Sequence, residues 1–238
     1  NVYAFITPSE FLKKKLSLNG FEEKRIHCIP TFTASKTTIG EQQIGSYGLY
    51  FGRVTEEKGV ETVIKAYEKL PEYTVKIMGD DTTDEAKRLK KYVENHKMKN
   101  VEFLGFKSGE ELENVIKGAR FTLIPSIWYD NLPNTALESF QYSKPVIASN
   151  IGSLPELVID GENGYLFKPS NVEDLIKKIK MLDDDTLVKK MGQASRKRLE
   201  SRFAPQTHYE ELMKIFNEAV KSRKSVSYTH LRAHETVL

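Results

Sequence analysis

The chain has 238 residues, of which 39% are hydrophobic and 29% charged, so it can bury a core as one large or two smaller domains. Its net charge of +3 is too small to indicate a nucleic-acid partner, and its single cysteine, Cys28, excludes an internal disulfide and is typical of a reducing compartment. No apolar run approaches the roughly 20 residues of a membrane span, and no signal-peptide pattern is visible, so we expect a cytoplasmic protein. Lysines at 13–15 and 177–178 are expected on exposed helix faces, which leaves open a weak preference for the inner face of a membrane.

The first 45 residues predict a strand, a helix, a second strand and a linker. The chain does not begin with Met, and Val2 to Ile6 has the pattern of a buried strand entered partway through a longer protein. Thr7-Pro8-Ser9-Glu10 has the spacing of a capping box with Pro at the first helical position, which predicts a helix over 11–18. Arg25 to Pro30 predicts a short strand, and the polar segment 31–45 a linker.

From Leu49 onward, apolar runs of strand length alternate with helical patterns. Strands are predicted over 49–52, 74–78, 101–104, 121–124, 146–149 and 165–167. Helices are predicted over 60–70, 85–96, 109–117, 134–142, 172–182, 186–202 and 206–221, with Ser108 and Glu111 forming a second capping box. This alternation predicts an α/β fold, a Rossmann-like parallel sheet flanked by helices.

Ligands of such sheets bind beyond the carboxyl ends of the strands. The residues expected at those ends are Gly52, Arg53, Gly79, Gly105, Pro125, Ser126 and Asp130. We therefore expect residues that are distant in the sequence to converge on one crevice.

Asp130 and Glu138 stand eight positions apart in a strand, loop and helix pattern. The helix start at Asn134 and Thr135 offers free N–H groups and the positive end of a dipole to phosphate. Ionised carboxylates accept hydrogen bonds from hydroxyls, so the segment fits a polyhydroxy ligand that bears phosphate, such as a nucleotide-sugar. Alternatively, Asp130 caps a turn and Glu138 lies on a solvated helix face.

Six segments between Ser46 and Ala219 carry a family resemblance. They are Tyr50–Gly59 (YFGRVTEEKG), Ile77–Asp80 (IMGD), Val101–Gly105 (VEFLG), Pro125–Ser126, Asp130-x7-Glu138 with Lys144–Ser149 (KPVIAS), and Gly152–Phe167. In this order they resemble the motifs of the retaining glycosyltransferases of family four, which have the GT-B fold. The chain then resembles the C-terminal half of that fold.

The resemblance implies a division of the chain into parts. Residues 1–30 correspond to the end of an N-terminal acceptor-binding domain and 31–45 to the interdomain linker. Residues 46–203 correspond to the nucleotide-sugar donor-binding domain, and 204–224 to a helix that returns toward the N-terminal domain. Residues 225–238 do not fit the family and are interpreted as a non-native tail.

The resemblance also implies roles for individual residues. Arg53 and Lys58 neutralise the donor diphosphate, and Asp130 holds hydroxyls of the sugar; these three form the catalytic set. The donor-binding set is Gly52, Gly79, Phe103, Leu104, Gly105, Pro125, Ser126, Asn134, Thr135 and Glu138, in which Glu138 binds the ribose and residues 103–105 lie near the base. Other interpretations are a surface salt bridge for Arg53 and a simple turn for Gly105. The implied chemistry needs no cofactor and no metal.

The implied activity is transfer of a hexose from a UDP-, GDP- or ADP-linked sugar to a hydroxyl of a glycan or lipid-linked acceptor, with retention of configuration. The fragment alone is expected to be inactive. An epimerase or a phosphorylase of the same fold is an alternative, although the first is expected to lack the Arg53 and Lys58 pairing and the second usually carries a pyridoxal-phosphate lysine. A different class is an inactive nucleotide-sugar-binding or scaffold module, favoured by Asp130 because the family more often has Glu there.

Overall fold

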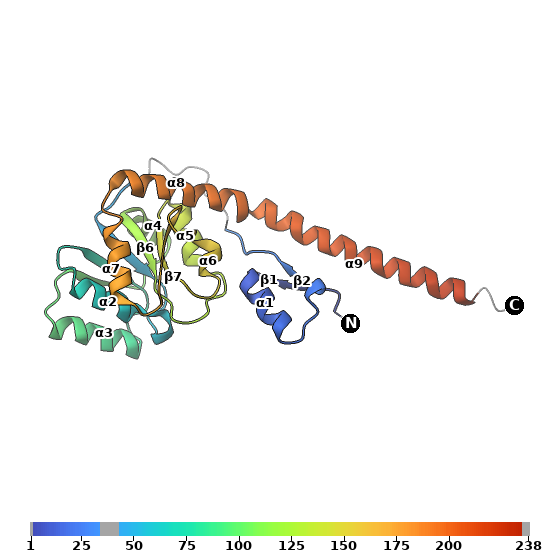
Figure 1. The fold of residues 1–238 in the computed structure, drawn as a ribbon, viewed down its shortest axis with the longest axis horizontal. Coiled ribbons are helices and arrows are strands. Elements are labelled where there is room, and N and C mark those ends of the chain that lie inside the picture. The colour runs from blue at the N-terminus through green and yellow to red at the C-terminus, as the bar shows by residue number, and fades with distance from the viewer. Residues whose placement is uncertain (1, 34–42, 235–238) are drawn as a thin grey trace.

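The computed structural model describes residues 2–33 and 43–234, with side chains up to residue 222. Its largest part is a six-stranded parallel sheet in the order β5-β4-β3-β6-β7-β8 (Figure 1). The strands are β3 (Tyr47–Phe51), β4 (Thr74–Met78), β5 (Val101–Gly105), β6 (Ala119–Ile124), β7 (Val146–Ser149) and β8 (Gly164–Phe167). The predicted class, a Rossmann-like parallel sheet flanked by helices, is confirmed.

Helices cover both faces of the sheet. One face packs against α2 (Val60–Glu68), α3 (Asp84–Asn95) and α7 (Val172–Lys180). The other packs against α4 (Gly109–Lys117), α5 (Asn134–Gln141) and α6 (Leu154–Leu157). The long α8 (Asp185–Arg202) follows α7 and contributes to a core cluster on each side, through Val188 and Met191 on one and Leu199 on the other.

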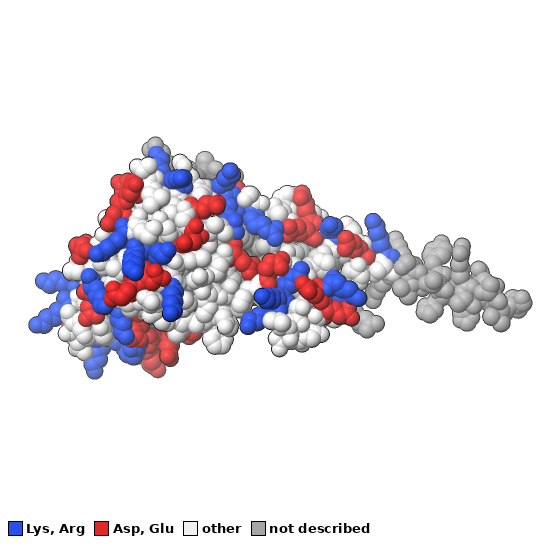
Figure 2. Space-filling model, in the orientation of Figure 1, with Lys and Arg blue, Asp and Glu red and all other residues white. Residues whose placement is uncertain are grey.

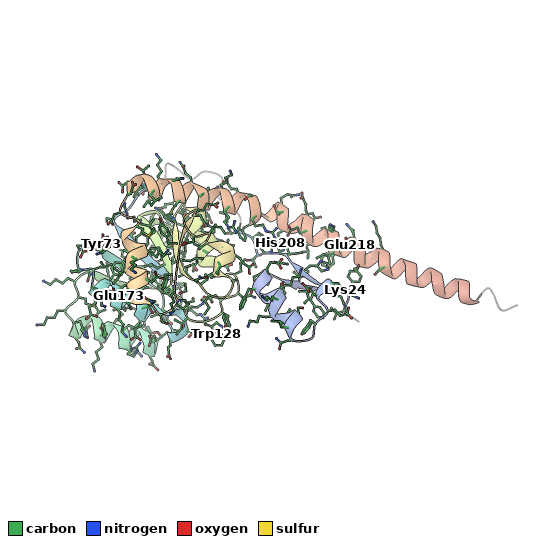
Figure 3. The ribbon with its side chains drawn as sticks, viewed as in Figure 1. Lys24, Tyr73, Trp128, Glu173, His208 and Glu218 are labelled. Carbon is green, nitrogen blue, oxygen red and sulfur yellow. The ribbon has the colours of Figure 1, made fainter. Side chains whose placement is uncertain are left out.

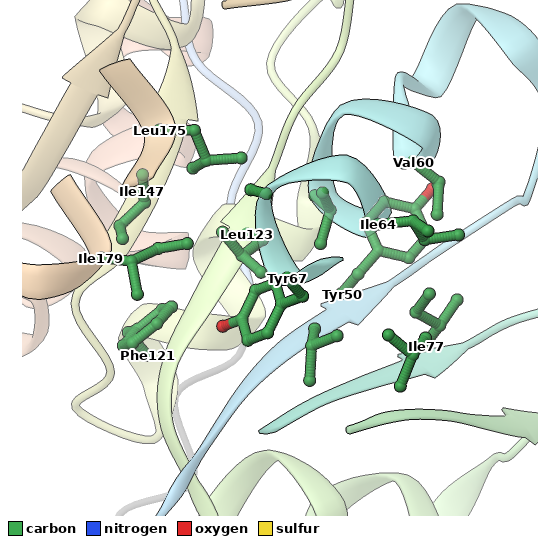
Figure 4. Close-up of a cluster of buried hydrophobic side chains, with 14 of the residues drawn as sticks. Tyr50, Val60, Ile64, Tyr67, Ile77, Phe121, Leu123, Ile147, Leu175 and Ile179 are labelled. Carbon is green, nitrogen blue, oxygen red and sulfur yellow. The ribbon is translucent and has the colours of Figure 1, made fainter. Parts of the chain in front are cut away.

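Alternating strand residues divide between the two faces, as the period of two requires. In β3, Tyr50 joins the cluster with α2, whereas Leu49 and Phe51 face α4. Figure 4 shows the first cluster, in which Ile64 and Tyr67 of α2 pack over strand residues that include Leu123. Burial of this apolar surface stabilises the sheet at roughly 25 cal/mol per Å².

Two predicted helix caps are wrong. Helix α1 (Glu10–Leu18) begins after Ser9, whose hydroxyl accepts the N–H of Leu12 at 3.1 Å, and not after Thr7. Thr7 is the last residue of β1 (Phe5–Thr7) and pairs with Cys28 of β2 (Ile26–Cys28). Its backbone is therefore part of a strand, and the helix cap lies two residues later, at Ser9. Ser108 does precede α4, but its side chain makes no capping hydrogen bond; Gly109 enters the helix with φ +56°, outside the geometry of a capping box.

The long α9 (Pro205–His234) runs alongside the N-terminal segment of residues 2–33 (Figure 1). His208 lies where the two meet (Figure 3); its Nδ1 is 2.7 Å from the carbonyl oxygen of Pro30, and its ring centre is 4.8 Å from that of Phe32. A cavity of about 310 Å³ farther along is lined by Ile26 and Cys28 of β2 and by Ile215 of α9. The helix is longer than the predicted 206–221.

The division of the chain into domains stays a prediction. Residues 34–42 of the expected linker lie outside the described residues, as do residues 235–238 and all side chains from 223 onward. The backbone of the interpreted tail, as far as His234, continues α9. No helix in the described part of the chain is long and apolar enough to cross a membrane.

Lys144 ties the backbone at Gln43 to the sheet. Its ammonium group is buried and donates to the carbonyl oxygens of Gln43, Lys117 and Ala119 at 2.6, 2.6 and 2.7 Å. Burial lowers the pKa of Lys144 to about 8. On the outer surface, side chains of both charges are interspersed over the face that Figure 2 shows.

Candidate functional site

A cavity of about 240 Å³ lies beyond the carboxyl ends of β3 and β6, where the topology of the sheet predicts a ligand. Its lining combines residues that the sequence placed at strand ends with the start of α5: Gly52, Arg53, Lys58, Ser126, Asp130, Asn134 and Thr135 among them. Of the residues expected at the strand ends, Gly52, Arg53, Ser126 and Asp130 line this cavity, whereas Gly79, Gly105 and Pro125 do not.

Lys58 and Asp130 form an ion pair in this cavity. Lys58 Nζ lies 2.5 Å from Asp130 Oδ1, and only 19% and 13% of the two side chains are exposed. The Ser126 hydroxyl donates to the other oxygen, Oδ2, of the same carboxylate. Asp130 is thus held by donors on both oxygens, and its side chain faces the cavity.

A glycine brings Lys58 to this position. Gly59 has φ +67°, and a Cβ on it would lie 2.1 Å from the carbonyl oxygen of Pro125. The turn Glu56–Lys58 can therefore pack directly on the exit of β6, where the N–H of Ile127 donates to the Glu57 carbonyl at 3.0 Å. The close approach places the Lys58 side chain opposite Asp130.

The loop that carries Asp130 is fixed from behind by Ser153. The Ser153 hydroxyl donates to the Asp130 carbonyl at 2.7 Å and accepts the N–H of Leu132 at 2.8 Å. Leu132 has φ +58°, a backbone conformation that is uncommon for a residue with a side chain and needs support from its surroundings. The buried Leu132 side chain and the two Ser153 bonds supply that support.

Arg53 lies at the rim of the cavity with 74% of its side chain exposed. Its guanidinium is 3.9 Å from a carboxylate oxygen of Glu57, a solvated pair that contributes little stability. The Arg53 carbonyl accepts the hydroxyl of Tyr50 at 2.5 Å, and burial, followed by the charge of Asp130, raises the pKa of Tyr50, which keeps it a donor. The backbone of Arg53 is thus held while its side chain can turn toward an anion.

Three glycines align at the ends of β3, β4 and β5. Gly52 donates to the Met78 carbonyl at 2.9 Å, and Gly79 to the Gly105 carbonyl at 3.0 Å. A Cβ on Gly79 would lie 1.9 Å from the carbonyl oxygen of Gly52, and Gly105 has φ +69°. The absence of a side chain at Gly79 therefore serves the contact between strand ends, which in turn positions the residue before Arg53.

The N-terminus of α5 opens into the cavity without a cap. Helices α1, α3, α7 and α8 begin with a side-chain cap, whereas α5 follows Pro133, which has none, and has no acidic residue in its first turn. Within the described residues, the N–H groups of Asn134 and Thr135 have no hydrogen-bond partner. Free N–H groups and the helix dipole together favour an anion there.

Glu138 lies one turn farther along α5, outside the set of residues that line the cavity. Its carboxyl is partly buried, burial raises its pKa, and no Lys or Arg side chain in the described part of the chain pairs with it. Phe103 and Leu104 are also absent from the lining, because they pack against the clusters on opposite faces of the sheet. Pro125 is buried at the exit of β6.

Sequence reasoning missed Tyr50, Asn131 and Ser153 as parts of the site. Tyr50 has the sequence features of an ordinary core residue of β3, but it also lines the cavity and its hydroxyl donates to the Arg53 carbonyl. Ser153 supports Asp130 from 23 positions away, a contact that no local pattern indicates. Within the described residues, no group of three or more His, Cys, Asp or Glu side chains could hold a metal ion.

Comparison with known proteins identifies the family of the chain. The family model described as glycosyl transferases group 1 matches residues 38–198, more than half of the chain. An uncharacterized glycosyltransferase of Methanocaldococcus jannaschii is 32% identical over 149 residues, which are 62% of this chain and 41% of that protein. A glycogen synthase of Mycobacterium tuberculosis is 31% identical over 186 residues, 74% of this chain and 42% of that protein. The chain thus spans less than half the length of these relatives.

Solved glycosyltransferase structures share the fold. A glycosyltransferase from Rickettsia africae superposes with a TM-score of 0.83 at 21% identity and covers 92% of this chain and 64% of that one. Anabaena HepE, solved in complex with UDP-glucose, gives a TM-score of 0.79 at 20% identity, with 93% and 64% covered. These likenesses establish the architecture, and the family match rests on the sequence. The chain belongs to the group 1 family of glycosyltransferases.

Proposed function

We propose that the protein to which this chain belongs transfers a hexose from a nucleotide-sugar to a hydroxyl of a glycan or lipid-linked acceptor, with retention of configuration. One observation carries the proposal: a lysine, an arginine, a carboxylate and an uncapped helix N-terminus meet around one cavity at the carboxyl edge of the sheet. Retention rests on the resemblance of the Asp130-x7-Glu138 motif to family four.

Each group has a chemical role in this proposal. The donor diphosphate binds at the N–H groups of Asn134 and Thr135, with Arg53 and Lys58 on its open side. As the glycosidic bond breaks, negative charge grows on the departing nucleotide, and these fixed positive groups stabilise it. Asp130 accepts hydroxyls of the transferred sugar.

The ribose is proposed to bind at Glu138. Its carboxylate lacks a cationic partner within the described residues and lies one helical turn beyond the phosphate position. Residues 103–105 and Gly79, at the ends of β5 and β4, are proposed to contribute backbone toward the base. The proposal needs no cofactor and no metal, because Arg53, Lys58 and the helix end supply the positive charge.

UDP is the first nucleotide to test, since the structural neighbour Anabaena HepE was solved with UDP-glucose; GDP and ADP are the alternatives. A cytoplasmic location, with peripheral contact to the inner face of a membrane, belongs to the same proposal.

Calorimetric titration of the chain with UDP, GDP and ADP tests the donor site. We expect one nucleotide to bind, and Arg53→Ala and Glu138→Ala to weaken it at least tenfold. Arg88→Ala is the matched control, because Arg88 is a half-exposed arginine that pairs with Glu61 and Glu85 away from the cavity. Equal affinity in all variants would contradict the assignment.

Turnover of the full-length protein separates an enzyme from an inactive module. The enzyme is expected to transfer sugar from the nucleotide that the chain binds, and Asp130→Ala is expected to abolish transfer while nucleotide binding persists. A full-length protein that binds the nucleotide-sugar but transfers nothing would instead be the scaffold module of the same fold.

A further inference from the structure

The N-terminal segment contacts the site through the first turn of α1. Glu156, in α6, accepts the N–H of Glu10 at 2.8 Å with Oε2 and the N–H of Phe11 at 2.7 Å with Oε1. A helix start leaves its first N–H groups unpaired, and a carboxylate there gains from both hydrogen bonds and the helix dipole. The Glu156 carbonyl in turn accepts from Arg198 of α8, which ties the backbone of Glu156 to that helix.

The capping residue of α1, Ser9, also contacts the loop that carries Asp130. Ser9 is fully buried, and its hydroxyl accepts the N–H of Leu12 while it donates to Asn131 Oδ1 at 3.1 Å. One hydroxyl therefore completes the helix start and binds the residue next to Asp130. A shift of α1 changes both contacts together.

A ring contact holds the residue on the other side of Asp130. The rings of Phe11 and Tyr129 have centres 5.0 Å apart, and the Lys15 ammonium lies 5.1 Å from the Tyr129 ring centre. Such aromatic and cation-π contacts are attractive beyond simple burial. Residues 129 and 131 are thus both held by α1, and Asp130 lies between them.

We propose that Glu156 is a positioning residue for the transfer reaction. By capping α1, it presses Ser9 and Phe11 against residues 129–131 and so fixes the direction of the Asp130 side chain toward the cavity. A movement of the N-terminal segment would therefore change the position of the Asp130 carboxylate. It would not change the N–H groups at the start of α5 that are proposed to bind the donor phosphate. The structural part, that Glu156 orders residues 129–131, does not depend on the activity of the protein. The kinetic part, that this order speeds the transfer, rests on the proposed function.

The structural part is tested with Trp128, the single tryptophan of the chain and the neighbour of Tyr129. Its side chain is largely exposed, so its time-resolved fluorescence anisotropy reports the motion of the loop and not that of the core. We expect Glu156→Ala and Ser9→Ala each to increase the amplitude of the fast local motion about twofold. Because both residues act on the same loop through the start of α1, the double variant is expected to show a smaller increase than the sum of the two single variants.

A control and an overturning result follow from the same measurement. Glu173→Gln removes the charge of a glutamate that also joins two elements, through its ion pair with Lys69, and it is expected to leave the Trp128 anisotropy unchanged. Unchanged anisotropy in Glu156→Ala, with circular dichroism showing a folded chain, would overturn the proposal.

The kinetic part uses the full-length protein. Glu156→Ala is expected to lower kcat about tenfold to a hundredfold, the effect of a misplacement near 1 Å, with a change in donor KM below about twofold. Glu156→Asp, which keeps the carboxylate, is expected to recover part of kcat. A rise in KM with kcat unchanged would overturn the positioning role. Failure of the wild-type chain to bind any nucleotide would instead refute the proposed function and leave the anisotropy result standing.

Discussion

Substitution of Gly79 by alanine tests whether the strand-end glycines position the phosphate site. A Cβ on Gly79 would lie 1.9 Å from the Gly52 carbonyl oxygen and 3.3 Å from a methyl group of Val54. Contacts of this kind need more than about 3 Å, so the two strand ends must separate by about 1 Å. The displaced atom belongs to the residue before Arg53, and the displacement therefore moves the guanidinium away from its place at the rim.

The expected magnitude has two parts. Overpacking of a well-packed site costs about 1–3 kcal/mol, which lowers the melting temperature of a chain of this size by about 2–12 °C. A shift of about 1 Å in a charged binding group is expected to weaken nucleotide affinity at least tenfold. Differential scanning fluorimetry measures the first effect, and calorimetric titration with the bound nucleotide measures the second.

Gly164 offers a matched control. A Cβ there would lie 1.9 Å from the carbonyl oxygen of Val146, which is the same clash at the amino end of β8, on the far side of the sheet. Gly164→Ala is therefore expected to cost similar stability and to leave nucleotide affinity unchanged. If the two variants lose affinity equally, or if Gly79→Ala binds as tightly as the wild type, the positioning of Arg53 by Gly79 is refuted.

Three further predictions concern buried titratable groups. Lys144→Met leaves three carbonyls without their donor and is expected to cost about 2–4 kcal/mol in urea denaturation, whereas the exposed Lys177→Met should change stability by less than about 0.5 kcal/mol. Glu138 has a pKa raised by burial, so it takes up a proton as the pH falls through a range above its ordinary value, and the ionised form is the better acceptor for ribose hydroxyls. Nucleotide affinity should therefore rise with pH through a range above the ordinary titration range of a glutamate, and Glu138→Gln should flatten the profile; a flat wild-type profile would exclude this role. Burial, helped by the charge of Glu10, raises the pKa of Cys28 to about 12, so mass spectrometry at pH 8 should show alkylation by iodoacetamide at least about 100-fold slower than that of free cysteine.

The sequence predicted the layered architecture and the edge of the sheet that carries the site. Strand and helix periods are local properties, and the predicted strands of the sheet agree with the observed ones within two residues at each end. The order of the motifs also indicated the family. The ligand edge followed from the parallel sheet itself, since the carboxyl ends of parallel strands lie on the same side.

Helix starts and side-chain partners depended on tertiary contacts. Thr7 has the sequence features of a cap, yet it pairs with Cys28 across β1 and β2, and the cap passes to Ser9. Phe103 and Leu104 alternate between the two faces of the sheet and pack there, so neither side chain reaches the cavity. The spacing of residues in the sequence does not indicate which of two possible partners a side chain or backbone group will contact in the folded chain.

The amino-acid sequence by itself thus determined the helices and strands, their order along the chain and the residue types at the strand ends. Only the folded structure decided that Lys58 faces Asp130 across 72 positions and that Glu156 caps a helix 145 positions away. The physical reason is that periodicity and capping motifs act between neighbours in the sequence, whereas ion pairs and hydrogen bonds form between whichever groups packing brings within about 3 Å.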